Sequence, residues 1–142
     1  MAKRIALKDH VSVDAVDLSQ FSRSVAFSSE HERVDVSGFT ATGANEYLAG
    51  QTEQSVTIEF FGSYGAAEVH QTLYPIHANR EVVALEWRPD QTTAVSATNP
   101  QLEGNVQLLT YSPSATRGEA ETWEATFVAA DADGLAYVTA GP

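Results

Sequence analysis

The fold is decided by residues 55–88, which read SVTIEFFGSYGAAEVHQTLYPIHANREVVALEWR. Apolar and polar residues alternate over Ser55–Phe60 and again over Val82–Arg88, as in strands with one buried face. Between them, helical spacing over Ala66–Tyr74 predicts a short helix, which Pro75 is expected to end. A helix this short is unstable alone in water, so it must pack on the two strands. The side chains expected to form this core are Val56, Ile58, Phe60, Val69, Leu73, Leu85 and Trp87.

Shorter alternating patterns predict further strands on both sides of this unit. They lie at Val11–Leu18 around a turn at Asp14-Ala15, and at Ser24–Phe27, Val34–Val36, Asn105–Tyr111, Glu121–Val128 and Leu135–Val138. Residues 37–54 lack regular periodicity and predict a long loop, which is unusual in a compact domain unless it is functional or disordered. We expect one domain over residues 1–142, with an N-terminal arm at 1–10. Its predicted class is mainly β, an antiparallel β-sandwich or partly closed β-barrel with one short flanking α-helix.

The composition is that of a globular protein, with 43% hydrophobic and 19% charged residues. The sequence has no apolar run of transmembrane length and no apolar segment of signal-peptide length near Met1, so no membrane anchor is expected. The chain has no cysteine, which excludes disulfides and thiolate metal sites and fits synthesis in the cytoplasm.

The net charge is −11, from 8 Lys and Arg against 19 Asp and Glu. Proteins that grip nucleic acid carry the opposite balance, because Lys and Arg release the counterions of the phosphates. An acidic wall could still guide DNA past it without binding, since repulsion reaches about 8 Å at physiological salt. The alternative is that the charge only keeps the protein soluble.

No catalytic, metal or cofactor site is predicted. His70 and His77 lie seven residues apart and straddle Pro75, so they do not form the helical i,i+4 pair of a metal site. His10 and His31 lie in polar segments without ligand-spaced partners. No serine occupies a nucleophile elbow, and no glycine-rich phosphate loop is present. The sequence therefore predicts a protein that is not an enzyme and needs no cofactor.

The outward positions of the four best strands are polar and acidic, with almost no lysine or arginine. The residues that stand out on them are Glu59, Glu86, Gln107 and Glu124. On pattern alone this is an ordinary solvated face. Lysines that usually protect strand edges are also scarce, so the subunit could add its edges to those of neighbours.

The sequence resembles the major tail, or tail-tube, proteins of long-tailed bacteriophages. The resemblance covers most of the chain in order. It rests on Val13–Ser19, Arg23–Val25, Val34–Val36, Ser55–Phe61, Glu86–Pro89 and Ser96–Pro100. It implies a structural virion protein of the tail whose hexameric rings stack into a hollow tube, and whose partners are other copies, the tape measure, the tail terminator and the distal tail protein.

The resemblance also suggests which residues meet DNA and which meet neighbouring rings. We expect Glu59, Glu86, Gln107 and Glu124 to face a lumen through which DNA passes without specific binding during ejection. We expect contacts between rings at Phe39, Tyr47 and Leu48, with Lys3 and Arg4 against acidic neighbours. Two alternatives are a capsid decoration or other virion protein, and a ligand-binding β-sandwich. The second would need an exposed aromatic platform, whereas the best aromatic residues occupy core positions of their strands.

Overall fold

The computed structural model describes residues 3–39 and 42–139. Its strands are β1 (His10–Val13), β2 (Val16–Asp17), β3 (Ser22–Asp35), β4 (Tyr47–Phe61), β5 (Val82–Arg88), β6 (Gln101–Ser112), β7 (Thr122–Ala129) and β8 (Ala136–Val138). One α-helix, α1 (Val69–Asn79), and one 3₁₀ turn, η1 (Ser19–Phe21), complete the regular structure of this part. The predicted class, mainly antiparallel β with a single helix, is confirmed. In the described residues no helix is both long and apolar enough to span a bilayer.

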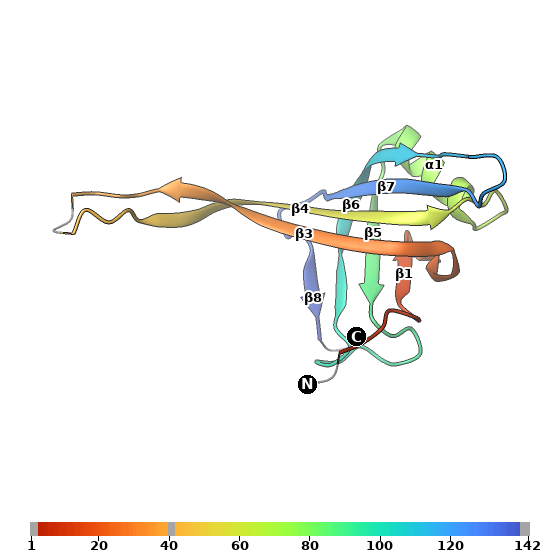
Figure 1. Ribbon diagram of the computed structural model, residues 1–142, viewed down its shortest axis with the longest axis horizontal. Helices are drawn as coiled ribbons and strands as arrows, with labels where there is room; N and C mark the ends of the chain where they lie inside the picture. Colours follow the sequence, from red (N-terminus) through yellow and green to blue (C-terminus); the bar gives the residue numbers. More distant parts are fainter. Residues whose placement is uncertain (1–2, 40–41, 140–142) are drawn as a thin grey trace.

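The strands form one antiparallel sheet that bends through β6. The order is β2-β1-β5-β6-β7-β4-β3, and β8 pairs with the start of β6. Residues 102–107 of β6 pair with β5, whereas residues 106–112 pair with β7. Figure 1 shows the consequence: β3, β4 and β7 run across the direction of β1, β5 and β8. The sheet thereby becomes two layers joined by β6, and it does not close into a barrel, because β2 and β3 remain its ends.

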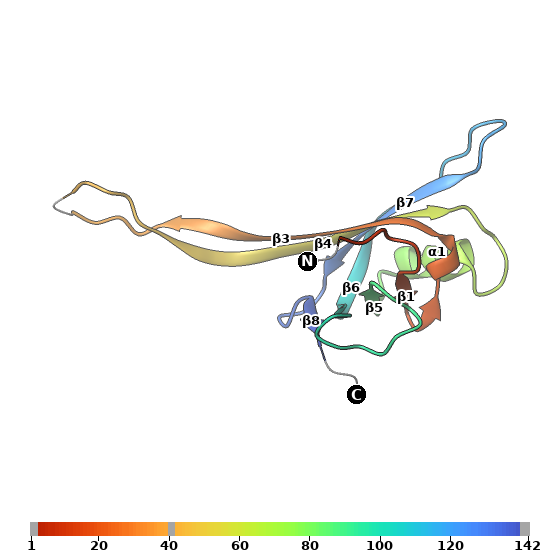
Figure 2. The ribbon, with the colours of Figure 1, turned by 60° about the horizontal axis from the view of Figure 1, so that its bottom comes forward.

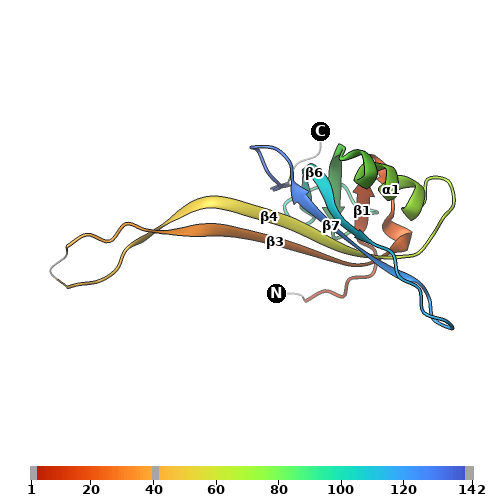
Figure 3. The same cartoon turned by 90° about the horizontal axis from the view of Figure 1, so that it is seen from above.

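The core lies between the two layers and under α1. One layer contributes Val56, Ile58, Phe60, Trp123, Ala125 and Phe127, and the other contributes Val11, Val13, Val83, Leu85 and Leu102. The helix adds Val69, Leu73 and Ile76, which share one face at i, i+4 and i+7. Figure 3 shows α1 on the same side of the β3–β4 ribbon as β1 and β6. The expected core is confirmed except at Trp87, which is only partly buried at its edge.

The predicted helix boundaries are wrong at both ends. The helix begins later than Ala66 because Ala67 has a φ of +58°, outside the helical region. Pro75 does not end it but lies inside it. Burial of Ile76, one residue beyond the proline, gives the last turns an apolar contact that outweighs the missing backbone hydrogen bond.

The helix ends instead in a left-handed cap at Arg80, with φ +54° and ψ +41°. The Arg80 N–H donates to the His77 carbonyl at 3.3 Å, and the Glu81 N–H donates to the Ile76 carbonyl at 3.1 Å. These two bonds form the Schellman arrangement, which satisfies carbonyls left free at a helix end.

The predicted N-terminal hairpin is confirmed. Strands β1 and β2 flank Asp14 and Ala15, whose φ values of +53° and +62° match a two-residue type I′ turn. Strand β1 also pairs with β5, which joins this hairpin to the layer of Leu85.

The longest feature is a two-stranded ribbon made by β3 and β4, which projects far beyond the two layers (Figures 1 and 2). We call its outer part, residues 29–39 and 42–54, the arm. The prediction of an irregular segment over 37–54 is wrong for residues 47–54, which belong to β4. Alternation failed to reveal this strand because the outer ribbon has no buried face to impose it.

Candidate assembly surfaces

The layer of β3, β4, β7 and the end of β6 presents a face rich in hydroxyl groups. Inward residues of these strands enter the core, so alternate residues point outward. Thr57 lies opposite Thr126, and Glu59 lies opposite Glu124. We call this outward surface the hydroxyl face. Its members are Ser24, Ala26, Ser28, Ser55, Thr57, Glu59, Phe61, Gln107, Thr110, Ser112, Thr122, Glu124, Thr126 and Val128.

The charges of the hydroxyl face are two carboxylates and one guanidinium. Directly opposed glutamates repel each other, and Arg23 offsets this at Glu59, where Nη1 lies 2.7 Å from Oε1. Arg23 reaches that position because the β3–β4 register shifts between Ser22 and Ser24. The pair is largely exposed, so its contribution to stability is small. Its effect is to leave this face with a slight negative balance.

Of the four residues expected to face a lumen, the structure places two side by side and a third, Gln107, at the bend of β6, where its Nε2 donates to the Arg80 carbonyl at 3.2 Å. Glu59 and Glu124 are cross-strand neighbours, and Gln107 lies on β6 in the same layer, opposite Val128. Glu86 lies elsewhere, on the outward side of β5, where it faces His10 at 3.7 Å. The sequence pattern could not separate them, because it predicts which residues point outward but not that the sheet bends at β6.

The same layer has two strand edges without a partner among the described residues. One is the outer edge of β3, which is the last strand of the sheet. The other is the end of β6: residues 109–112 pair with β7 only, since β5 pairs with β6 no further than Gln107. Unpaired edges of this kind are templates for adding another strand.

The arm carries exposed apolar side chains on one of its sides. Val34 lies opposite Leu48, and Val36 follows on the same side. Their exposed fractions are 39%, 62% and 43%. We call these three residues the apolar strip. Gly50 borders it, and a side chain there would collide with Val34.

Several other residues of the arm contact one another. On the other side the Arg33 guanidinium lies 4.2 Å from the centre of the Tyr47 ring. Hydrogen bonds from the hydroxyl and amide of Ser37 lower the pKa of Asp35. Phe39 is fully exposed in the loop. Tyr47, Leu48 and Phe39, expected to contact neighbouring rings, are thus exposed on the arm.

Two cations of the N-terminal segment, Arg4 and Lys8, face carboxylates of their own chain. Arg4 Nη2 lies 2.7 Å from Asp9 Oδ1 and also donates to the Pro89 carbonyl at 3.1 Å. Lys8 Nζ lies 3.3 Å from Asp90 Oδ2. Lys3 is exposed. These contacts hold the segment against the 89–100 loop, a role that the sequence did not reveal.

The histidines and aromatic residues take part in packing. His70 Nδ1 lies 3.0 Å from the Tyr111 hydroxyl, and His77 Nδ1 lies 3.2 Å from the Leu108 carbonyl. Trp123, Phe60 and Phe127 are fully buried, so they offer no aromatic platform to a ligand. Within residues 3–39 and 42–139, no group of three His, Asp or Glu side chains could hold a metal ion.

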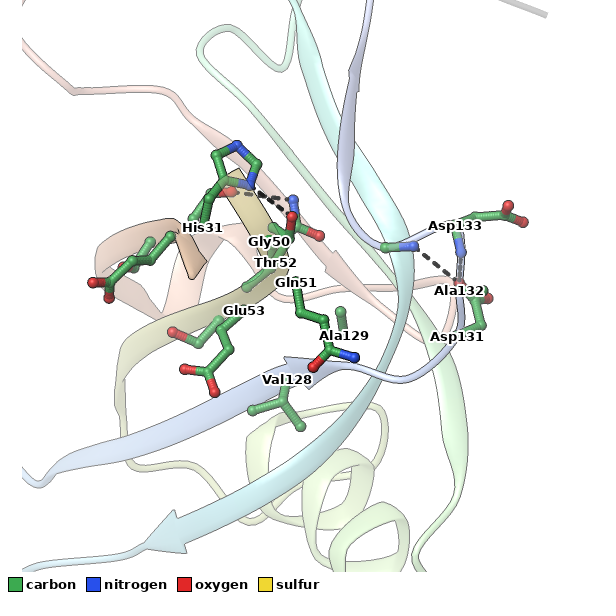
Figure 4. A pocket seen from close by; sticks show the side chains of 16 residues that line it. His31, Gly50, Gln51, Thr52, Glu53, Val128, Ala129, Asp131, Ala132 and Asp133 are labelled. Carbon is green, nitrogen blue, oxygen red and sulfur yellow. Dashed lines mark hydrogen bonds between the residues drawn. The ribbon is translucent and has the colours of Figure 1, made fainter. Parts of the chain in front are cut away.

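A cleft of about 1130 Å³ separates the arm from the turn that precedes β8. Figure 4 shows His31, Thr52 and Glu53 on the arm side and Asp131 and Asp133 on the turn side. Sequence reasoning missed this cleft, because it placed residues 37–54 in an irregular loop and could not bring them against the turn.

Comparisons with solved structures agree on one fold, whereas no protein-family model and no curated protein matches the chain. A chain of the virion of a native gene transfer agent particle superposes with a TM-score of 0.73 at 16% identity, covering 96% of this chain and 100% of that chain. The tail of an empty gene transfer agent particle gives 0.67 at 17% identity, covering 84% and 83%. The SPP1 tail tube gives 0.63 at 12% identity, covering 95% and 76%. The fold is therefore that of tail-tube structures.

Proposed function

We propose that this chain is the major structural subunit of a phage-type tail tube. The observation that carries the proposal is the tail-tube fold together with a four-stranded layer that has a free edge at each end. Such a subunit would be built for assembly rather than for catalysis. Its place would be the virion tail, after synthesis in the host cytoplasm.

In this proposal the free edge of β3 in one copy pairs with the end of β6 in the next. The two edges are different surfaces, so the contact is head-to-tail, and it closes into a ring when the rotation between copies allows. We expect six copies, as in the tail of the gene transfer agent particle refined with C6 symmetry. The joined layers would form a continuous inner wall of β-strands.

The hydroxyl face is our candidate for the lumen, with Glu59, Gln107 and Glu124 toward the passing DNA. Among the described residues, Arg23 is the one cation of this face, and it is already paired with Glu59. A wall of hydroxyls and carboxylates has no free cation with which to release the counterions of DNA. DNA would therefore pass along it without being held.

The arm is our candidate for contacts between stacked rings. Its apolar strip, with Phe39 and Tyr47, is exposed in the single chain and would be covered by a neighbouring ring. In this proposal the exposed Lys3, together with Arg4, would meet acidic residues of a neighbour. The ends of such a tube would meet the tape measure, terminator and distal tail proteins.

Negative-stain electron microscopy of the purified chain at rising concentration tests the proposal. We expect six-fold rings or hollow tubes. Particles that stay single at every concentration, with and without a tail-tip extract as initiator, would contradict it.

Labelling of single cysteines tests the lumen assignment, because the chain has none of its own. Glu124→Cys should react with a bulky polymer maleimide in the unassembled chain and become protected in tubes. Glu86→Cys, on the outward side of the other layer, is the matched control and should stay reactive. The reverse pattern would place the hydroxyl face on the outside of the tube.

A further inference from the structure

The arm leaves the two layers at one residue of β4. Pairing between β4 and β7 covers Ser55–Phe61 and ends there. Gln54 is the first residue beyond it, and from this point outward β4 has only β3 beside it. A two-stranded ribbon alone is marginally stable and bends easily. Its direction therefore depends on whatever contacts it makes at the exit.

The Gln54 side chain makes such a contact with the backbone of one residue, Leu135. The Leu135 N–H donates to Gln54 Oε1 at 2.7 Å, and Gln54 Nε2 donates to the Leu135 carbonyl at 2.9 Å. The amide group thus imitates a strand partner, with both of its polar atoms used. Nε2 also approaches the Ser29 hydroxyl at 3.4 Å, which ties in β3.

Leu135, the hydrogen-bond partner of Gln54, is itself held firmly against the two layers. Leu135 is buried in the core, and the turn before it is held by Asn105 Nδ2, which donates to Asp131 Oδ2 at 2.8 Å. Gly134 has a φ of +64°, and a side chain there would collide with Gln54 Oε1. A glycine at this position allows the close approach of the glutamine amide.

Beyond Gln54 nothing comparable holds the arm. Among the described residues, no hydrogen bond or ion pair joins residues 30–35 or 47–53 to the rest of the chain outside the arm. The cleft of Figure 4 opens there, with carboxylates on both walls: Glu30 and Glu53 on the arm, Asp131 and Asp133 on the turn. These like charges repel, so they do not draw the arm toward the turn.

We propose that Gln54 is the positioning residue that sets the direction of the arm relative to the two layers. Its consequence for assembly rests on the function proposed above: an arm that points in one direction meets the next ring in register, whereas a swinging arm pays an entropic cost to do so.

Distances between spin labels test the direction of the arm in the unassembled chain, independently of tube formation. Nitroxides are attached at Ala49→Cys on the arm and Ala84→Cys on β5, in a chain without other cysteines. Gln54→Ala should broaden the distance distribution. Gln51→Ala, an exposed arm glutamine three residues away, is the matched control and should leave it unchanged. An unchanged distribution in Gln54→Ala overturns the proposal.

A second variant separates the hydrogen bonds from packing. Gln54→Glu keeps the size of the side chain and an acceptor for the Leu135 N–H, but it places a carboxylate oxygen against the Leu135 carbonyl. We expect it to broaden the distribution as Gln54→Ala does and to make exchange of the Leu135 amide hydrogen about tenfold faster. Distances and exchange like those of the parent chain would contradict the role of the paired hydrogen bonds.

Electron microscopy then tests the consequence for assembly. If the parent chain forms tubes, Gln54→Ala should give rings that stack poorly, while Gln51→Ala stacks normally. Equal stacking would refute the link between arm direction and assembly. A parent chain that forms no rings would refute the proposed function, whereas the spin-label result would still decide the role of Gln54.

Discussion

Leu48 on the arm offers the sharpest test of how the proposed rings would be held together. Its side chain is 62% exposed in the single chain and lies opposite Val34 in the apolar strip. If a neighbouring ring covers the strip, replacing this side chain by serine removes apolar contact area from every copy. The variant should therefore fold normally but assemble less readily.

The expected size follows from the exposed fraction. Full burial of a leucine side chain contributes about 1.5–3 kcal/mol, so covering the exposed 62% of Leu48 contributes about 1.4 kcal/mol per contact. That free energy corresponds to a factor of about ten in an equilibrium constant. Leu48→Ser should therefore raise the critical concentration for tube growth about tenfold, measured by sedimentation of tubes across a dilution series.

The control is Val82→Ser, which removes an apolar side chain of similar exposure, 54%, from the start of β5. Both variants should keep the melting temperature of the single chain close to that of the parent, because both side chains already face solvent. An unchanged critical concentration in Leu48→Ser would refute the assignment of the apolar strip. An equal rise in Val82→Ser would mean that the loss is not specific to the arm.

Three further predictions concern the stability of the single chain in urea. Pro75→Ala restores a backbone N–H inside α1 and should stabilise the protein by about 1–3 kcal/mol; a loss of stability would contradict the helical role of this residue. Asn99 is buried, and its side-chain amide donates to three backbone carbonyls of the 89–100 loop. Asn99→Ala should therefore lower the free energy of unfolding by about 2 kcal/mol, and Asn99→Asp should lower it further, because a carboxylate would face those carbonyl oxygens. Equal losses of stability in the two variants would refute this. Burial, with Tyr64 nearby, raises the pKa of Tyr111 to about 12, so the neutral phenol contributes stability that is complete below about pH 10 and lost on raising the pH toward 12. Tyr111→Phe should flatten that alkaline loss, and an unchanged pH profile would count against it.

Sequence patterns predicted the elements that have one buried face. The strands around Ile58, Leu85 and Phe127 were predicted because a buried face imposes alternation, and the turn at Asp14-Ala15 because short apolar stretches flank it. The helix was predicted, but its end was misplaced. The residue before a proline, here Tyr74, prefers an extended backbone, and the burial of Ile76 in the core outweighed that preference.

The features on which the proposed assembly depends were harder to predict, for a common physical reason. A ribbon exposed on both sides carries no periodic signal, so β4 beyond Gln54 was predicted as loop. The bend of the sheet at β6 depends on which strands pair with each half of that strand, so the separation of Glu86 from Glu59 is a property of topology rather than of local sequence. The contacts of Gln54 and Leu135 join residues 81 apart and have no local signature.

The net charge of −11 bears on two steps of the proposed function. A subunit whose layer of β3, β4, β7 and β6 has two edges without a partner among the described residues, and which exposes an apolar strip, is at risk of pairing indiscriminately. Directly opposed glutamates, Glu30 with Glu53 and Glu86 with Glu103, add local repulsion to the general repulsion between copies. We expect only a contact that pairs a whole strand edge, or covers the whole apolar strip, to gain enough free energy to exceed this repulsion. In the proposed tube, the charge that would let DNA pass would thus also select the contacts between subunits.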